Sequence, residues 1–446
     1  MASAAEKMAA SMNLGTFAKA TDLKKRIWFT LGALIVFRLG TYIPVPGVDA
    51  AVMAHLMTQN GAGILGMFNM FTGGALGRMT IFALNVMPYI SSSIIIQMMT
   101  AAVPQLQALK KEGDSGRQRL NQYTRYLTVV IATVQAYGIS IGLQGMKSDL
   151  GPAVIDPGFF FTFTCVVTLV GGTLFLMWLG EQITSRGIGN GVSLIIFSGI
   201  VANLPIAIAN ILELGATGAL STFFIITFFV GFFAVIAFVV FMERAQRRVL
   251  VQYPKRQVGQ RMFGGESTHM PLKVNTSGVL APIFASSLLL IPATIVGFSK
   301  GGGPGWLLFL GRELSHGQPG YMILYAALIV FFAYFATATV FNPEETADSL
   351  KKNGGFIPGI RPGANTAAYF DAVLTRLTTI GAAYLVIVCL LPEFVLSKYS
   401  LPFYFGGTSL LIIVSVTMDT VAQVQSHLLA HQYEGLIRKS RGRSRK

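Results

Sequence analysis

Long runs of uncharged, mostly apolar residues recur along this 446-residue chain and are separated by shorter polar segments. A helix needs about 20 such residues to cross the hydrocarbon core of a bilayer. The runs lack the two-residue alternation of barrel strands, so they predict membrane-spanning helices. Ten spans are expected, at residues 27–43, 79–103, 126–143, 159–179, 192–211, 220–242, 279–298, 321–341, 378–391 and 404–429.

The second span is preceded by an apolar stretch that is too short to cross the membrane. Residues 64–71 number only eight, and a glycine-rich joint with Gly73, Gly74 and Gly77 follows them. Irregular backbone at membrane depth is tolerated only inside protein or beside a water-filled cavity. The pattern therefore predicts a cavity or pore at residues 61–77, with the glycines as hinge positions.

Composition excludes an ordinary soluble domain. Hydrophobic residues make up 53% of the chain and charged residues 12%, and the mean hydropathy is +0.60. Arg38 and Asp419 are the ionisable residues within the expected spans. Cys165 and Cys389 lie in separate spans and are interpreted as packing residues. The fold class is therefore all-α, a polytopic membrane bundle of ten transmembrane helices.

Charge distribution sets the expected orientation. Of the 34 Lys and Arg residues, 28 fall on the side of the bundle that also holds both termini. The positive-inside rule places that side in the cytoplasm, and no cleavable signal peptide is expected before the first span. The chain then divides into a cytoplasmic tail (1–26), a five-span half (27–214), a second half (215–430) and a basic cytoplasmic tail (431–446). Five spans per half predict an inverted arrangement around a central pore.

Two inner connections are long enough to be functional. In residues 243–275, apolar and basic residues alternate around Val249–Val251, which predicts a short hairpin. In residues 342–371, two Pro-Gly steps flank Arg361 and predict a stiff tip that carries a cation. We expect docking surfaces for a cytosolic partner here, the alternative being solvated connections.

Several chemistries have no visible site. The chain has no phosphate-binding loop, HExxH helix, GxSxG elbow or CxxC pair, so we expect neither an enzyme nor a cofactor or metal. Carboxylates on an ion pathway are also lacking, which argues against an ion-coupled carrier. Uncharged polar clusters on spans two and seven are compatible either with a switchable contact or with ordinary packing. They comprise Ser91, Ser92, Ser93, Gln97, Asn275, Thr276, Ser286 and Ser287.

Five motifs, taken in order, carry a family resemblance. They are GMFNMFTGGAL with MPYISSSIIIQ from Gly66, GIGNGVS from Gly187, APIFASS from Ala281, FIPGIRPG from Phe356 and YFGGTSLLI from Tyr404. Together they resemble the SecY family of bacterial protein-conducting channels. The resemblance implies a channel in the bacterial cytoplasmic (inner) membrane that passes unfolded secretory chains and releases transmembrane segments sideways into lipid. The alternative hypothesis is a ten-span secondary transporter for a neutral small solute.

The resemblance also implies partners and site residues. The partners are the membrane subunits SecE and SecG, the motor ATPase SecA, the ribosome with its rRNA, signal peptides and membrane lipid. A closing plug is implied at Ile64, Leu65, Met67, Phe68, Asn69, Met70 and Phe71. An aliphatic pore ring is implied at Val86, Ile90, Val192, Ile196, Ile283 and Ile412, and a lateral gate between spans two and three and spans seven and eight at Ser91, Gln97, Asn275, Ser287 and Ile291. Partner docking is implied at Arg361, Arg247, Arg248, Lys255 and Arg256.

Overall fold

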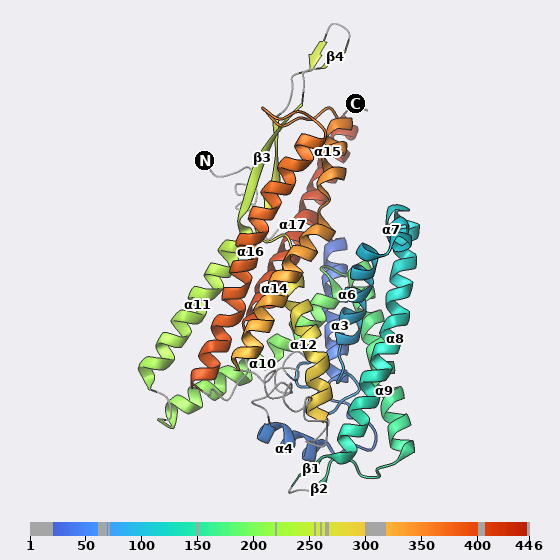
Figure 1. Ribbon diagram of the computed structural model, residues 1–446, viewed down its shortest axis with the longest axis vertical. Helices are drawn as coiled ribbons and strands as arrows, with labels where there is room; N and C mark the ends of the chain where they lie inside the picture. The colour runs from blue at the N-terminus through green and yellow to red at the C-terminus, as the bar shows by residue number, and fades with distance from the viewer. Residues whose placement is uncertain are drawn as a thin grey trace.

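The fold is almost entirely helical (Figure 1). The computed structural model describes residues 21–60, 69, 72–148, 151–218, 221–253, 256–258, 261–263, 267–298, 318–399 and 406–443. The helices of the first half are α3 Thr21–Gly40, α4 Ala50–Asn60, α6 Met87–Ala102, α7 Pro104–Lys111, α8 Asp114–Gly145, α9 Phe159–Arg186 and α10 Gly191–Ala216. Those of the second half are α11 Thr222–Arg244, α12 Leu280–Phe298, α14 Pro319–Val340, α15 Pro343–Lys352, α16 Ala364–Tyr399 and α17 Gly407–Arg443.

Seven of the described helices are long and apolar enough to cross a membrane, namely α8, α9, α10, α11, α14, α16 and α17. The other three expected spans fall on α3, α6 and α12. Every predicted span thus coincides with a helix, and the predicted all-α class is confirmed.

The second expected span begins later than the sequence predicted. The apolar run starts at Met79, but α6 starts at Met87, and residues 73–86 consist mainly of turns. Met79 and Asn85 have positive φ angles, which a helix cannot contain, and Pro88 lies in the first turn of α6. At 16 residues, α6 is only about 24 Å long. Hydropathy alone could not reveal this because the turns are as apolar as a helix.

The two halves meet along two seams. On one side α12 packs against α6 and α8, and on the other α10 packs against α17 and α11 while α3 touches α17. Within the halves, α8 packs on α9 and α6, and α14 packs on α12 and α16. A single large apolar cluster runs through the junction and draws residues from both halves.

Three short antiparallel sheets complete the described fold: β1 Lys147–Ser148 with β2 Gly151–Pro152, β3 Gln246–Gln252 with β6 Ser267–Lys273, and β4 Arg256–Val258 with β5 Arg261–Phe263. The β3–β6 hairpin projects from one end of the bundle, with β4 beyond it (Figure 1). The predicted hairpin is confirmed. Val249 and Val251 are buried while Leu250 between them is half-buried, as the alternation required.

Candidate functional site

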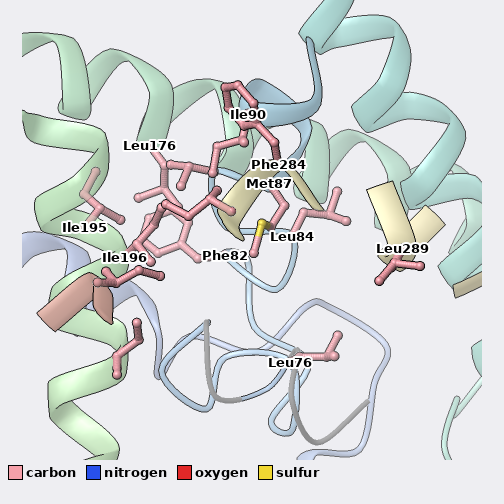
Figure 2. Packing of buried hydrophobic residues seen from close by; sticks show 14 of the residues in the cluster. Leu76, Phe82, Leu84, Met87, Ile90, Leu176, Ile195, Ile196, Phe284 and Leu289 are labelled. Atoms are coloured by element: carbon pink, nitrogen blue, oxygen red, sulfur yellow. The ribbon is translucent and has the colours of Figure 1, made fainter. Parts of the chain in front are cut away.

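The six aliphatic residues expected to form a pore ring all contribute to one large apolar core that draws on both halves. Val86 directly precedes α6 and Ile90 lies in its first turn, while Val192 and Ile196 lie on α10, Ile283 on α12 and Ile412 on α17. Five of them are at most 7% exposed, and Val192 packs against the same apolar cluster. Figure 2 shows Ile90 and Ile196 within this cluster, together with Phe82, Met87 and Phe284. None of the six side chains is ionisable, which is compatible with the expected ring, since apolar constrictions gate by excluding water.

The turns before α6 form a folded base at the constriction. The Asn69 backbone carbonyl accepts from the Gly74 N–H at 2.8 Å, and its side-chain Oδ1 accepts from the Gly77 N–H at 2.6 Å. The Thr72 hydroxyl donates to the Asn69 carbonyl and accepts from the Leu76 N–H. These bonds satisfy buried backbone groups that a helix would have paired internally. We call residues 72–86 with Asn69 the base loop.

Aromatic packing fixes the base loop to neighbouring helices. Phe82 stacks on Phe37 of α3 at 6.1 Å between ring centroids and on Phe175 of α9 at 5.8 Å. Gly40 faces the Phe82 ring so closely that a Cβ there would overlap it. Backbone hydrogen bonds from Ile81 to Ile43 and from Val45 to Met79 add a strand-like contact. The base loop is therefore part of the first half.

The seam between α6 and α12 is built differently. Ser287 of α12 is 2% exposed, and its hydroxyl donates to the Met87 sulfur of α6 at 4.0 Å. Ser286 instead donates to the Ile283 carbonyl of its own helix. Near one end of the seam, Lys110 of α7 donates to the Thr339 carbonyl of α14 at 3.3 Å in an exposed position. A thioether is a weak acceptor, so apolar packing supplies most of the contact.

The two long connections expected to act as docking surfaces form one packed unit. Gln252 of β3 and Phe356 exchange both backbone hydrogen bonds at 2.9 Å. Val249 and Leu272 of the hairpin share an apolar cluster with Ile357 and with residues of α16. We call residues 246–273 and 342–371 the loop unit. It holds Arg247, Arg248 and Arg361 with exposed side chains.

Comparison with known proteins adds a family to this geometry. The SecY family model matches residues 80–421. Curated relatives described as protein translocase subunit SecY are 55% identical over 418 residues in Rickettsia conorii and 56% identical over 420 residues in Escherichia coli K12. Each comparison covers 94% of this chain, with 96% and 95% of the respective relative. The chain belongs to the SecY family.

The fold of this SecY-family chain agrees with that of solved channels. A structure described as a protein conducting channel has a TM-score of 0.66 at 17% identity, covering 91% of this chain and 92% of its own. Sec61 in a canine ribosome-channel complex has a TM-score of 0.62 at 17% identity, with the same coverage. The chain is a membrane-embedded channel subunit of a protein translocase, and the comparisons give the small-solute transporter no support.

Some of the expected site residues of this SecY-family chain fall outside the described part. Among the plug residues only Asn69 is described, while Ile64, Leu65, Met67, Phe68, Met70 and Phe71 lie outside, as does Lys255. Arg256 lies on β4 and Ile291 on α12, but their side chains are outside the described set.

Two of the polar gate residues, Gln97 and Asn275, make their side-chain hydrogen bonds within their own halves. The Gln97 amide donates to Ser93, one turn earlier in α6. Asn275 donates to the Glu243 carboxylate at 2.6 Å and accepts from Ser277 and from the Gly278 N–H. Ser91 is buried in α6. Ser287 is thus the gate residue whose hydroxyl reaches the opposite helix.

Sequence reasoning overlooked three contributors to the site. Met87 accepts the bond from Ser287, Gly40 makes room for Phe82, and Arg38 bonds the base loop. Arg38 did carry a signal, because an arginine inside an apolar span marks a functional position by default. Nothing in the sequence indicates which group Arg38 contacts. The other two depend on contacts between segments far apart in sequence.

Proposed function

We propose that this SecY-family chain conducts unfolded secretory polypeptides between its two halves and releases apolar segments through the α6–α12 seam. One observation supports the proposal: the six aliphatic side chains come from both halves and all belong to, or pack against, the apolar core, beside the turns that precede α6. An apolar ring closes around any side chain without binding it, which suits a substrate of arbitrary sequence. The chain itself would catalyse no reaction.

The proposal includes a plug at residues 61–77, supported by the folded base loop, in which Leu76 lies below Ile90 in the view of Figure 2. A relative in structure is described as having a plug domain that stabilises the closed state of the channel and maintains a membrane seal; its TM-score is 0.62 at 18% identity. We assign the same role to this segment, with Phe68 in its centre.

The loop unit would face the cytoplasm and receive SecA or the ribosome. Most Lys and Arg residues of the chain are expected on the cytoplasmic side of the bundle. Clustered cations attract RNA phosphates. Arg361 sits between two glycines with positive φ, Gly359 at 82° and Gly363 at 111°, and its carbonyl accepts from Thr366. SecE and SecG would join within the cytoplasmic membrane.

A crosslink across the seam tests the channel proposal. Met87→Cys with Ser287→Cys, joined by a short bismaleimide, holds the two halves together. We expect the joined protein to stop exporting a signal-bearing precursor in inverted membrane vesicles. The matched control is Thr337→Cys with Thr378→Cys, whose hydroxyls lie 3.3 Å apart within the second half. Complete crosslinking at the seam with normal export would contradict the proposal.

Charge reversal tests the docking role. Arg361→Glu should abolish SecA-driven export and leave the protein folded and inserted, because a carboxylate repels the acidic surface that a cation attracts. Lys352→Glu is the control, since Lys352 is exposed in the last turn of α15 on the same unit. Equal loss in both variants, or normal export by Arg361→Glu, would exclude a specific role for Arg361.

A further inference from the structure

Arg38 is the ionisable residue of the first span, and the channel proposal gives it no task. It lies in the last turn of α3, where the negative end of the helix dipole favours a cation. The ordinary expectation is that its side chain reaches for the membrane surface. The Arg38 side chain instead makes hydrogen bonds within the protein.

The Arg38 guanidinium is bonded to the base loop. Its Nη1 donates to the Gly73 carbonyl at 2.8 Å, and its Nη2 donates to the Tyr42 hydroxyl at 3.2 Å. The Tyr42 ring also lies under Arg78, whose Cζ is 4.3 Å from the ring centroid. Two guanidinium groups are thus held around one aromatic ring at this end of α3.

Gly73 of the base loop packs closely against Gly199 of α10. It has φ of +68°, and a Cβ added to it would lie 3.0 Å from the Gly199 Cα and 3.1 Å from the Arg38 Nη1. Because its carbonyl belongs to a non-helical segment at membrane depth, it needs a donor from outside the loop. Arg38 supplies that donor with a charged group, which makes the stronger kind of hydrogen bond.

We propose that Arg38 is a positioning residue that clamps the base loop against α10 and thereby keeps the plug seated in the idle channel. This inference rests on the proposed function, since it presupposes that residues 61–77 seal the pore. The clamp joins α3, the base loop and α10, all in the first half. The base loop therefore stays in place when the two halves part, and Gly73 and Gly77 act as close-packing positions.

The test is ion leak through the idle channel. The purified complex, in liposomes loaded with potassium chloride, is assayed for chloride efflux without a precursor. Arg38→Gln should raise the efflux about tenfold, the shift expected from losing one charge-assisted hydrogen bond. Arg38→Lys, which keeps one charged donor, should restore much of the seal.

The matched control is Arg26→Gln. Arg26 lies on the same helix, and its Nη1 donates to another glycine carbonyl, that of Gly187, at 3.3 Å, remote from the base loop. We expect no added efflux from this variant. Gly73→Ala attacks the same clamp from the other side, because its Cβ would press on Gly199, and it should leak as Arg38→Gln does. This second variant decides the matter if Arg38→Gln fails to accumulate in membranes.

A plug-disabling variant separates the two claims. Phe68→Asp with Phe71→Asp places two carboxylates in the proposed seal and should leak strongly. If it leaks while Arg38→Gln and Gly73→Ala stay tight, the clamp is wrong and the plug stands. If none of the three leaks, the plug assignment fails and the clamp fails with it. If the Arg38 variant leaks but the double Asp variant does not, Arg38 acts by another route and the inference is overturned.

Discussion

The base loop and the α6–α12 seam both contribute to the apolar core where the halves meet, but they are held in opposite ways. The base loop is fixed by directional contacts within the first half: the Asn69 and Thr72 hydrogen bonds, the Phe82 ring stack and the Arg38 bond to Gly73. The seam joins the two halves through apolar side chains and a hydroxyl-to-thioether contact. Directional bonds fix a geometry, whereas apolar contact alone permits separation and return. We therefore expect the channel to open at the seam and to keep its base loop in place.

The largest effect is expected from filling the space beside Phe82. Gly40→Val would overlap the Phe82 ring and break its stack with Phe37, and overpacking of this kind costs about 1–3 kcal/mol or more. We expect a clear fall in the thermal unfolding temperature of the purified complex in detergent. Gly32→Val, on the same helix with no atom within 4 Å, should leave it unchanged. Equal losses in both would mean that α3 itself, and not the base loop, is sensitive.

A polar group in the constriction should have an intermediate effect. Ile90→Asn buries an amide without partners, which costs about 1–3 kcal/mol in the closed state. We expect faster chloride efflux from liposomes and export of precursors with defective signals. Ile95→Asn is the control, since Ile95 is on the same helix but 37% exposed. If the channel with Ile90→Asn stayed tight to chloride, Ile90 would not be part of the ring that closes the pore.

The smallest effect is expected at the seam hydroxyl. Ser287→Ala loses the bond to Met87, and membrane interhelical bonds average about 0.6 kcal/mol, or roughly a threefold shift. Export of precursors with weakened signal sequences should rise slightly. Ser286→Ala, whose hydroxyl bonds within α12, should show no rise. A large effect in Ser287→Ala would mean that the seam depends on directional bonding after all.

The sequence predicted the features that depend on local pattern better than the contacts between distant segments. Each of the ten expected spans overlaps a described helix, and the alternation around Val249 identified the hairpin, because both signals are local in the sequence. The ring positions followed from a family resemblance, and the structure brings them into one cluster. The start of α6 was placed eight residues too early, since turns at Met79 and Asn85 are as apolar as a helix. Two further contacts, from Arg38 to Gly73 and between Gln252 and Phe356, join segments that are far apart in the sequence. A local sequence pattern cannot predict contacts of this kind.

The most direct test of the comparison is a pair of distance measurements by spin labels. One pair, at Met99 of α6 and Leu288 of α12, spans the seam at exposed positions. The other, at Ile81 of the base loop and Phe163 of α9, lies within the first half. With a precursor arrested in the channel, we predict a longer seam distance and an unchanged base distance. A base distance that changes as much as the seam distance would contradict the account.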